Sequence, residues 1–158
     1  MNPMTTHTTI IAALTALTAL IATPMFAEGA AVITTEQAEN YGSYLVDDVG
    51  RPVYIFMSDK PAGPTETRDF CSSADCLKAW PLFITNGPPR GTAKVTASLI
   101  GTISYEGKTV VTYNGWPLHY YEQDVNEDTY DFGRPQGNNY KSFGGQWQLR
   151  QPSGERAN

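Results

Sequence analysis

The sequence contains one aromatic segment twice, and this repetition constrains the fold more than any other feature. The segment VYIFMSD (residues 53–59) returns 65 positions later as LHYYEQD (residues 118–124). In each copy a glycine-containing turn precedes the segment, and a tryptophan follows its final aspartate after an intervening loop. Repeated supersecondary units generally bury against one another. We therefore expect two β halves related by pseudo-twofold symmetry, over about residues 44–84 and about residues 109–150.

Turn signals divide the chain into short strands. Asn-Gly at 114–115 lies between two apolar runs, and it is the strongest short hairpin signal because both residues tolerate the positive φ of a type I′ turn. Together with Glu-Gly at 106–107 it predicts a three-stranded meander over about residues 102–122. Residues 47–50, Asp-Asp-Val-Gly, predict another hairpin, in which the glycine takes the positive-φ position.

Helical patterns are short. The stretch SSADCLKAW (72–80) predicts one or two helical turns because a serine can cap the first turn. TASLIG (96–101) predicts one more turn that ends at its glycine, and GGQWQLR (144–150) predicts a final strand with one solvent-facing side. These patterns together predict an all-β fold, a small and mostly antiparallel β domain, sandwich or barrel-like, over residues 41–152 with one or two short helical turns.

The first residues have the pattern of an export signal. Residues 10–22 are apolar apart from two threonines, a run too short to span a bilayer comfortably, and the small Ala27 suits signal-peptide cleavage. We expect residues 1–27 to be a signal peptide, residues 28–40 a flexible lead-in and residues 153–158 a tail. After cleavage we expect no membrane span and a periplasmic or secreted protein. No Lys or Arg precedes the apolar run, which leaves an uncleaved anchoring segment as the alternative.

The charge balance argues against nucleic acid as a partner. The chain has 11 Lys and Arg against 16 Asp and Glu, which gives a formal net charge of −5. Binding to a phosphate backbone requires clustered Lys or Arg, and the sequence has no such cluster. We therefore expect an unknown protein or small molecule, and no nucleic acid, as the partner.

Cys71 and Cys76 are the two cysteines of the chain. In an oxidising compartment such a pair predicts a disulfide. A redox-active pair is the alternative, but the Cys-x-x-Cys spacing and the βαβ context of thioredoxin-like sites are absent.

The aromatic segments are first of all structural. Apolar side chains alternate onto both faces of residues 53–57, so we expect this strand to be covered on both sides. Prolines follow Asp59 and cannot continue a ladder, and an aspartate at a strand exit commonly accepts hydrogen bonds from the next turn. We therefore predict a structural role for the six motif positions, which are Tyr54, Phe56, Asp59, His119, Tyr121 and Asp124.

Catalytic and metal chemistry have little support in the sequence. His119 is the one histidine that follows the leader, and we expect it to be a half-buried ring with a polar tip. No nucleophile–base pair is recognisable, so we expect a non-enzymatic protein. We predict no cofactor, and the alternative is calcium on an acidic loop, or copper or haem bound by His119 and Met57. The acidic loop comprises Asp124, Asn126, Asp128 and Asp131.

Aromatic side chains are the best candidates for ligand contact. They crowd residues 116–143 among Asn, Gln and Asp, with Tyr140 and Phe143 near the end of the run. An exposed subset would suit stacking against sugars or a protein partner, because Tyr and Trp combine a large contact area with a polar group. The residues that we expect to face a ligand are Trp80, Trp116, Tyr120 and Trp147.

Several motifs together carry a family resemblance. YIFMSD, the cysteine pair followed by LKAWPLF, LIGTISYEGKTVVTYNGWPLHYYEQD and FGGQWQL resemble the bacterial secreted-repeat family described as predicted lipoproteins with a Yx(FWY)xxD motif, over about residues 44–152. The resemblance implies export and a repeated β architecture but no activity, because the family has no known function. The chain differs by His119 in place of Tyr, a wider cysteine pair and the lack of a lipid-attachment cysteine. We therefore expect an exported binding or envelope-associated module, with a metal- or redox-linked periplasmic protein as the alternative.

Overall fold

The structure is a computed structural model and describes residues 29–59, 71–124 and 135–157. Short strands dominate these residues, with one α-helix and two 3-10 turns. The strands are β1 (Val32–Ala38), β2 (Gly42–Asp47), β3 (Tyr54–Phe56), β4 (Arg90–Gly91), β5 (Ile100–Tyr105), β6 (Lys108–Tyr113), β7 (Trp116–Pro117), β8 (Lys141–Ser142) and β9 (Gly145–Leu149). The helical elements are α1 (Ala74–Ala79), η1 (Ala97–Leu99) and η2 (Glu122–Asp124).

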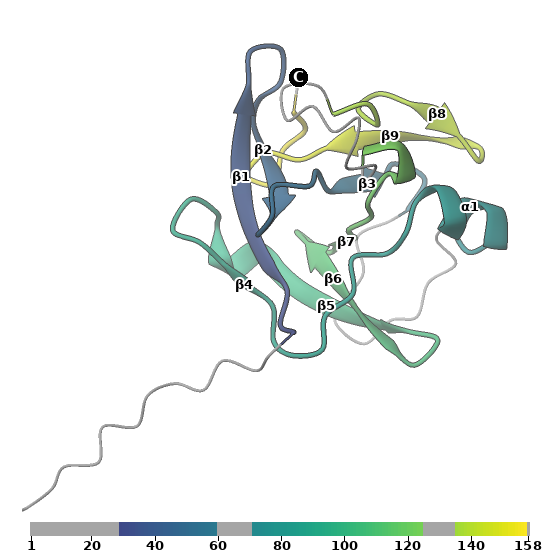
Figure 1. The fold of residues 1–158 in the computed structure, drawn as a ribbon, viewed down its shortest axis with the longest axis horizontal. Coiled ribbons are helices and arrows are strands. Elements are labelled where there is room, and N and C mark those ends of the chain that lie inside the picture. The colour runs from purple at the N-terminus through teal and green to yellow at the C-terminus, as the bar shows by residue number, and fades with distance from the viewer. Residues whose placement is uncertain (1–28, 60–70, 125–134, 158) are drawn as a thin grey trace, which may run out of the picture.

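Three small sheets make up the fold, in the strand orders β2-β1-β4, β3-β9-β8 and β5-β6-β7. Among these pairs β1–β4 is parallel and the others are antiparallel. Figure 1 shows the sheets around a common centre, with β1 and β2 on the left, β8 and β9 at the upper right, and β5 and β6 below. The mostly antiparallel β fold is confirmed, and the sheets are open rather than closed on themselves. No helix in the described part of the chain is long and apolar enough to cross a membrane.

The strand β1 lies within residues 28–40, where a flexible lead-in was expected, so that expectation is wrong for Val32–Ala38. Six residues of β1, from Ile33 to Ala38, pair in register with β2. The sequence VITTEQA is rich in the β-branched residues that suit strands, and Ile33 is fully buried in the core. The polar residues of this segment make the strand hard to recognise in the sequence, although its partner, β2, follows directly in the chain.

The predicted hairpins form as expected. Asn114 and Gly115 have φ values of 50° and 77°, and Glu106 and Gly107 have values of 46° and 75°, so both turns have the positive φ pair of a type I′ hairpin. Gly50 also has a positive φ, 88°, in the turn after β2. The meander β5-β6-β7 is therefore confirmed.

The two predicted helical turns are present, but the second does not end at a glycine. The side chain of Ser73 caps α1 by accepting a hydrogen bond from the backbone N–H of Cys76, at 3.2 Å. The turn η1 runs directly into β5, and Gly101 is a residue of that strand. A Cβ atom at Gly101 would lie 2.9 Å from the Oγ1 atom of Thr112, so the glycine permits close strand packing instead of ending a helix.

The strand β9 is buried on both sides, which corrects the expectation of one solvent-facing side. Trp147 and Leu149 are fully buried, but Gln148 and Arg150 on the other side are also only 2% and 7% exposed. The guanidinium of Arg150 lies over the ring of Trp116, 5.3 Å from its centroid. Polar residues that alternate along a strand can still be buried when side chains from another part of the chain cover them. The alternation of polar and apolar residues in the sequence does not predict this burial.

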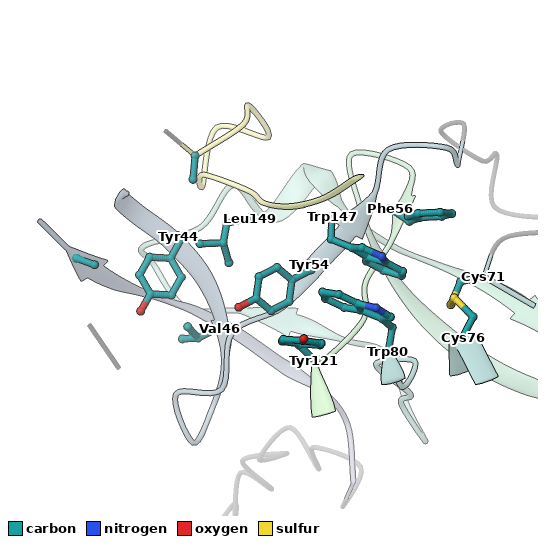
Figure 2. Packing of buried hydrophobic residues seen from close by; sticks show 12 residues of the cluster. Tyr44, Val46, Tyr54, Phe56, Cys71, Cys76, Trp80, Tyr121, Trp147 and Leu149 are labelled. Carbon is teal, nitrogen blue, oxygen red and sulfur yellow. A yellow bond between two sulfur atoms is a disulfide. The ribbon is translucent and has the colours of Figure 1, made fainter. Parts of the chain in front are cut away.

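The aromatic core lies between β3, β9 and α1 (Figure 2). The rings of Trp80 and Trp147 stack with centroids 3.9 Å apart and planes 3° from parallel, and Phe56 stacks on the other side of Trp147 at 4.5 Å. The predicted disulfide joins Cys71 to Cys76 at the edge of this core. The main members of the aromatic core are Tyr44, Val46, Tyr54, Phe56, Trp80, Tyr121, Trp147 and Leu149.

A second core lies on the other side of β3 and contains mostly aliphatic side chains. Its buried members include Ile33, Leu45, Val53, Ile55, Phe83, Val111, Tyr113 and Leu118. The chain end after β9 also packs inward, because Ala157 is buried and its backbone N–H donates to the carbonyl of Leu149 at 3.1 Å. The tail expected over residues 153–158 is therefore folded against the domain at least as far as Ala157.

The two aromatic segments meet at equivalent residues. Tyr54 and His119 exchange two backbone hydrogen bonds, of 2.8 and 2.9 Å. Tyr54 also pairs with Leu149, two residues after Trp147, and His119 also pairs with Leu82, two residues after Trp80. The segment that contains Tyr54 thus pairs with the segment that contains His119 and with the residues after Trp147. The segment that contains His119 pairs in the same way with the residues after Trp80.

Candidate functional site: an aromatic cleft

The motif residues lie in the interior, although Tyr121 also lines the cleft described below. Tyr54 and His119 have no exposed surface, and Phe56 and Tyr121 are 5% and 4% exposed. Asp59 is also buried, and its backbone N–H donates to the carbonyl of Phe56 at 3.0 Å. The loop that its carboxylate was expected to organise, residues 60–70, lies outside the described residues.

The tyrosine of the first segment bonds to the aspartate of the second. The hydroxyl of Tyr54 donates to Oδ2 of Asp124, while Oδ1 accepts the backbone N–H of Gln136 at 3.0 Å. Burial raises the pKa of Asp124, and burial together with the Asp124 carboxylate raises the pKa of Tyr54 well above its usual value. Both carboxylate oxygens therefore serve the fold. The other three residues of the expected calcium loop, Asn126, Asp128 and Asp131, lie outside the described residues.

His119 is fully buried, where a half-buried ring was expected. Its Nδ1 atom lies 3.0 Å from the carbonyl oxygen of Trp80, and its ring is nearly perpendicular to that of Trp147, with centroids 5.0 Å apart. Burial lowers the pKa of His119 to about 4, so the imidazole is neutral at pH 7. Within the described ranges, no group of three or more His, Cys, Asp or Glu side chains could hold a metal ion.

Tyr120 and Trp116 are half-buried and face the second core. The hydroxyl of Tyr120 donates to Oδ2 of Asp47 at 3.1 Å, and Arg51 lies over the Tyr120 ring, 4.9 Å from its centroid. Arg51 also forms a salt bridge with Asp47 at 2.7 Å. These contacts hold the turn after β2 against the segment of residues 118–124. Tyr120 therefore stabilises the fold, and Arg51 covers a face of its ring.

The best candidate site is a cleft beside the aromatic core, which we call the aromatic cleft. It has a volume of about 250 Å³ and opens between the end of α1, η2 and the β8–β9 hairpin. Tyr140 and Phe143 stand at this cleft with 46% and 47% of their surface exposed, and they are among the most exposed large apolar side chains described. The lining residues are Ala79, Trp80, Tyr121, Glu122, Gln123, Tyr140, Ser142 and Phe143.

Two of the three tryptophans expected to face a ligand do not present their rings to solvent. Trp80 and Trp147 are both fully buried, and Trp80 contributes only to the floor of the aromatic cleft. Tyr121 stacks on Trp80 at 4.1 Å, and Tyr140 lies 5.6 Å from Tyr121 between ring centroids. Burial and the neighbouring Tyr140 raise the pKa of Tyr121 to about 12. The rings thus form one continuous stack from the core to the surface.

Phe143 occupies an unfavourable backbone conformation. It is the first residue of the two-residue turn between β8 and β9, with φ of 52°, and Gly144 follows at 80°. A bulky side chain at positive φ is a rare outlier, whereas Asn and Gly accept it. The equivalent position is Asn114 in the turn between β6 and β7 and Glu106, at a φ of 46°, in the turn between β5 and β6. Of these three turns, the one beside the cleft has an aromatic residue at this position.

Ser142 connects the core to the cleft. Its Oγ atom accepts hydrogen bonds from the indole N–H of Trp147 at 3.1 Å and from that of Trp80 at 3.3 Å. The same side chain lines the aromatic cleft. Two donors occupy the acceptor capacity of this hydroxyl, so its own proton remains available for donation.

Two of the four aromatic residues that the sequence suggested for ligand contact, Trp80 and Trp147, are fully buried in the structure. Trp80 and Trp147 are the largest apolar residues and therefore fill the core, while Tyr140 and Phe143 remain outside. The sequence signal for this cleft was the pair Phe143-Gly144, because phenylalanine stands where a hairpin turn favours Asn.

Comparison with known proteins adds no family, since no protein-family model, no curated protein and no solved structure matches the chain.

Proposed function

We propose that the protein is an exported, non-enzymatic binding module whose ligand contacts the aromatic cleft. The observation that carries this proposal is Phe143, an exposed phenylalanine held at a φ of 52° beside Tyr140. Backbone strain of this kind costs on the order of 1–3 kcal/mol and is concentrated at ligand clamps and similar sites. An exposed aromatic residue that the fold tolerates at such a cost is best explained by a contact outside the chain.

Export is supported by the leader and by the disulfide. Residues 1–27 have the apolar run and the small terminal residue of a signal peptide, and the Cys71–Cys76 bond is of the kind that persists in oxidising compartments. Mass spectrometry of the protein recovered from a bacterial periplasm tests this part. The expected product begins at Glu28, and a full-length chain retained with the membranes would contradict the proposed cleavage.

The strand pairing supports an internal duplication, and with it the resemblance to the secreted-repeat family. Tyr54 and His119 are equivalent under the shift of 65, and they pair with each other. Their other partners, Leu149 and Leu82, both stand two residues after the tryptophan of the opposite copy. Reciprocal pairing of this kind is expected of two copies of one unit packed about a twofold axis.

A titration with chemically distinct compounds tests the binding proposal. The mature, oxidised protein would be titrated with maltotriose, cellotriose, triacetylchitotriose, a blocked tripeptide, choline and glucose 6-phosphate while its NMR spectrum is followed. Whichever compound binds should shift the signals of Tyr140 and Phe143, and the variant Phe143→Asn should weaken that binding. Val49→Asn is the matched control, because Val49 is 62% exposed at a different turn. If every compound leaves the cleft signals in place, the proposed function is wrong.

A further inference from the structure

We propose that the aromatic cleft binds one pyranose ring of a neutral glycan. This inference rests on the proposed function, because it names the ligand class for the same cleft. The cleft supplies three kinds of contact together, namely exposed aromatic faces, a hydroxyl that can only donate, and carboxylate and amide oxygens. A sugar ring carries the complement of all three.

The aromatic faces fit the apolar side of a sugar. Tyr140 and Phe143 line the cleft, and about half of the surface of each residue is exposed. Aromatic rings contribute large contact areas at a small entropic cost, and the tyrosine adds a polar group. A pyranose ring has a flat face of C–H groups that can lie on such a ring, while its hydroxyl groups point sideways toward the polar walls.

Ser142 distinguishes a hydroxylated ligand from a purely cationic one. Its oxygen already accepts the indole N–H groups of Trp80 and Trp147, at 3.3 and 3.1 Å. The hydroxyl proton is thus directed to an acceptor other than these indoles, and a sugar hydroxyl or ring oxygen is such an acceptor. A quaternary ammonium group has no acceptor to offer this proton.

The charge at the cleft disfavours an anionic ligand. Glu122 lines the cleft together with Gln123, and no Lys or Arg belongs to the lining that the structure describes. A carboxylate accepts hydrogen bonds from sugar hydroxyls but repels a phosphate or carboxylate ligand. The acidic formal charge of −5 acts in the same direction.

The size of the cleft suits one ring and not an extended ligand. Its volume of about 250 Å³ is below the roughly 300–1,000 Å³ of pockets that enclose drug-sized molecules. One sugar residue can therefore occupy the cleft while the neighbouring residues of the glycan remain in solvent. Weak binding in the millimolar range is expected for so small a contact.

The titration described above also tests the ligand class. We expect one or more of the three neutral trisaccharides to shift the signals of Ser142, Tyr140 and Phe143, and Phe143→Asn to weaken binding about tenfold. Glu122→Gln is a second variant, which retains the shape of the cleft and should weaken binding severalfold. Val49→Asn should leave the affinity unchanged.

Each other outcome overturns a different statement. Binding of choline, the tripeptide or glucose 6-phosphate at the cleft without any trisaccharide would reject the sugar and retain the binding module. A trisaccharide that binds while the cleft signals remain unchanged would reject the cleft as the sugar site. The wild-type titration decides both points even if one variant fails to fold.

Discussion

Trp80 and Trp147 stack with their ring centroids 3.9 Å apart, and both indole N–H groups donate to the hydroxyl of Ser142. These two fully buried rings therefore share a hydrogen-bond acceptor that also lines the aromatic cleft. A ligand that bonds to Ser142 would be coupled through this hydroxyl to the centre of the aromatic core.

Replacement of Ser142 by alanine should destabilise the fold. The change removes the acceptor of two buried indole N–H groups, and each buried donor without a partner costs about 1–3 kcal/mol. We expect the free energy of unfolding to fall by about 2 kcal/mol in urea titrations followed by tryptophan fluorescence. Ser98→Ala is the control, because Ser98 is exposed. Equal stability of the two variants would show that Ser142 does not hold the indoles.

Replacement of Phe143 by asparagine should stabilise the fold while it weakens ligand binding. Asparagine tolerates the φ of 52° that Phe143 adopts, so the strain of the turn is relieved. We expect a gain of about 1 kcal/mol in the free energy of unfolding. Glu106→Asn makes the same replacement in a turn away from the cleft and should also stabilise without any effect on binding. A loss of stability in Phe143→Asn would mean that the ring supports the hairpin.

Stability should fall between pH 7 and pH 5 because of His119. Its pKa is about 4 in the folded protein and about 6.5 in an unfolded chain, so the unfolded state binds more protons as the pH falls through this interval. The contribution of His119 is therefore complete above pH 6.5, and it decreases by up to about 3 kcal/mol as the pH approaches 4. The variant His119→Phe should show a flatter pH profile in urea titrations. An unchanged slope would assign the acid sensitivity to other groups.

Tyr54 and Asp124 should prove strongly coupled. Tyr54→Phe removes the hydroxyl that donates to Asp124, which leaves a buried carboxylate with one fewer donor and should cost about 1–3 kcal/mol at pH 7. A double-mutant cycle with Asp124→Asn should give an interaction energy above about 1 kcal/mol. The penalty of Tyr54→Phe should shrink at low pH, because a protonated Asp124 carries no charge. Additive effects of the two changes would contradict the coupling.

Reduction of the disulfide should weaken the fold without abolishing it. Cys71 and Cys76 are five positions apart, and closure of so small a loop stabilises by about 2 kcal/mol in the chain-entropy model. We expect a loss of this size when urea titrations are repeated with a reductant, and no response to the reductant in the double variant Cys71→Ala, Cys76→Ala. Complete unfolding on reduction would show that the bond holds more than its own loop.

The sequence predicted the features that depend on neighbouring residues. The turns at 106–107 and 114–115, the cap at Ser73 and the Cys71–Cys76 bond each follow from chemistry within a few positions. The repeat also identified Tyr54 and His119 as related positions, although nothing in one strand shows that the two would pair.

The features that depend on distant residues were not predictable in this way. The sequence of β1 is largely polar, and its burial depends on pairing with β2. Arg150 alternates with apolar residues as a solvent-facing side chain would, but Trp116 and Met57 cover it. Aromatic residues posed the same difficulty, since Trp80 and Phe143 are equally suited to a core or to a ligand. Tertiary packing decides which of these aromatic residues is buried and which is exposed. At Phe143 the unfavourable residue in a hairpin turn is a local indication that the ring is exposed.

The reciprocal pairing of Tyr54 with Leu149 and of Leu82 with His119 has a consequence for biosynthesis. The strand β3 has no complete set of neighbours until β9, near the end of the chain, has been made. Pairings so distant in sequence form slowly, because loop closure must precede them. In the proposed export, such late pairing would keep β3 from completing its sheet before β9 has also passed through a translocation channel.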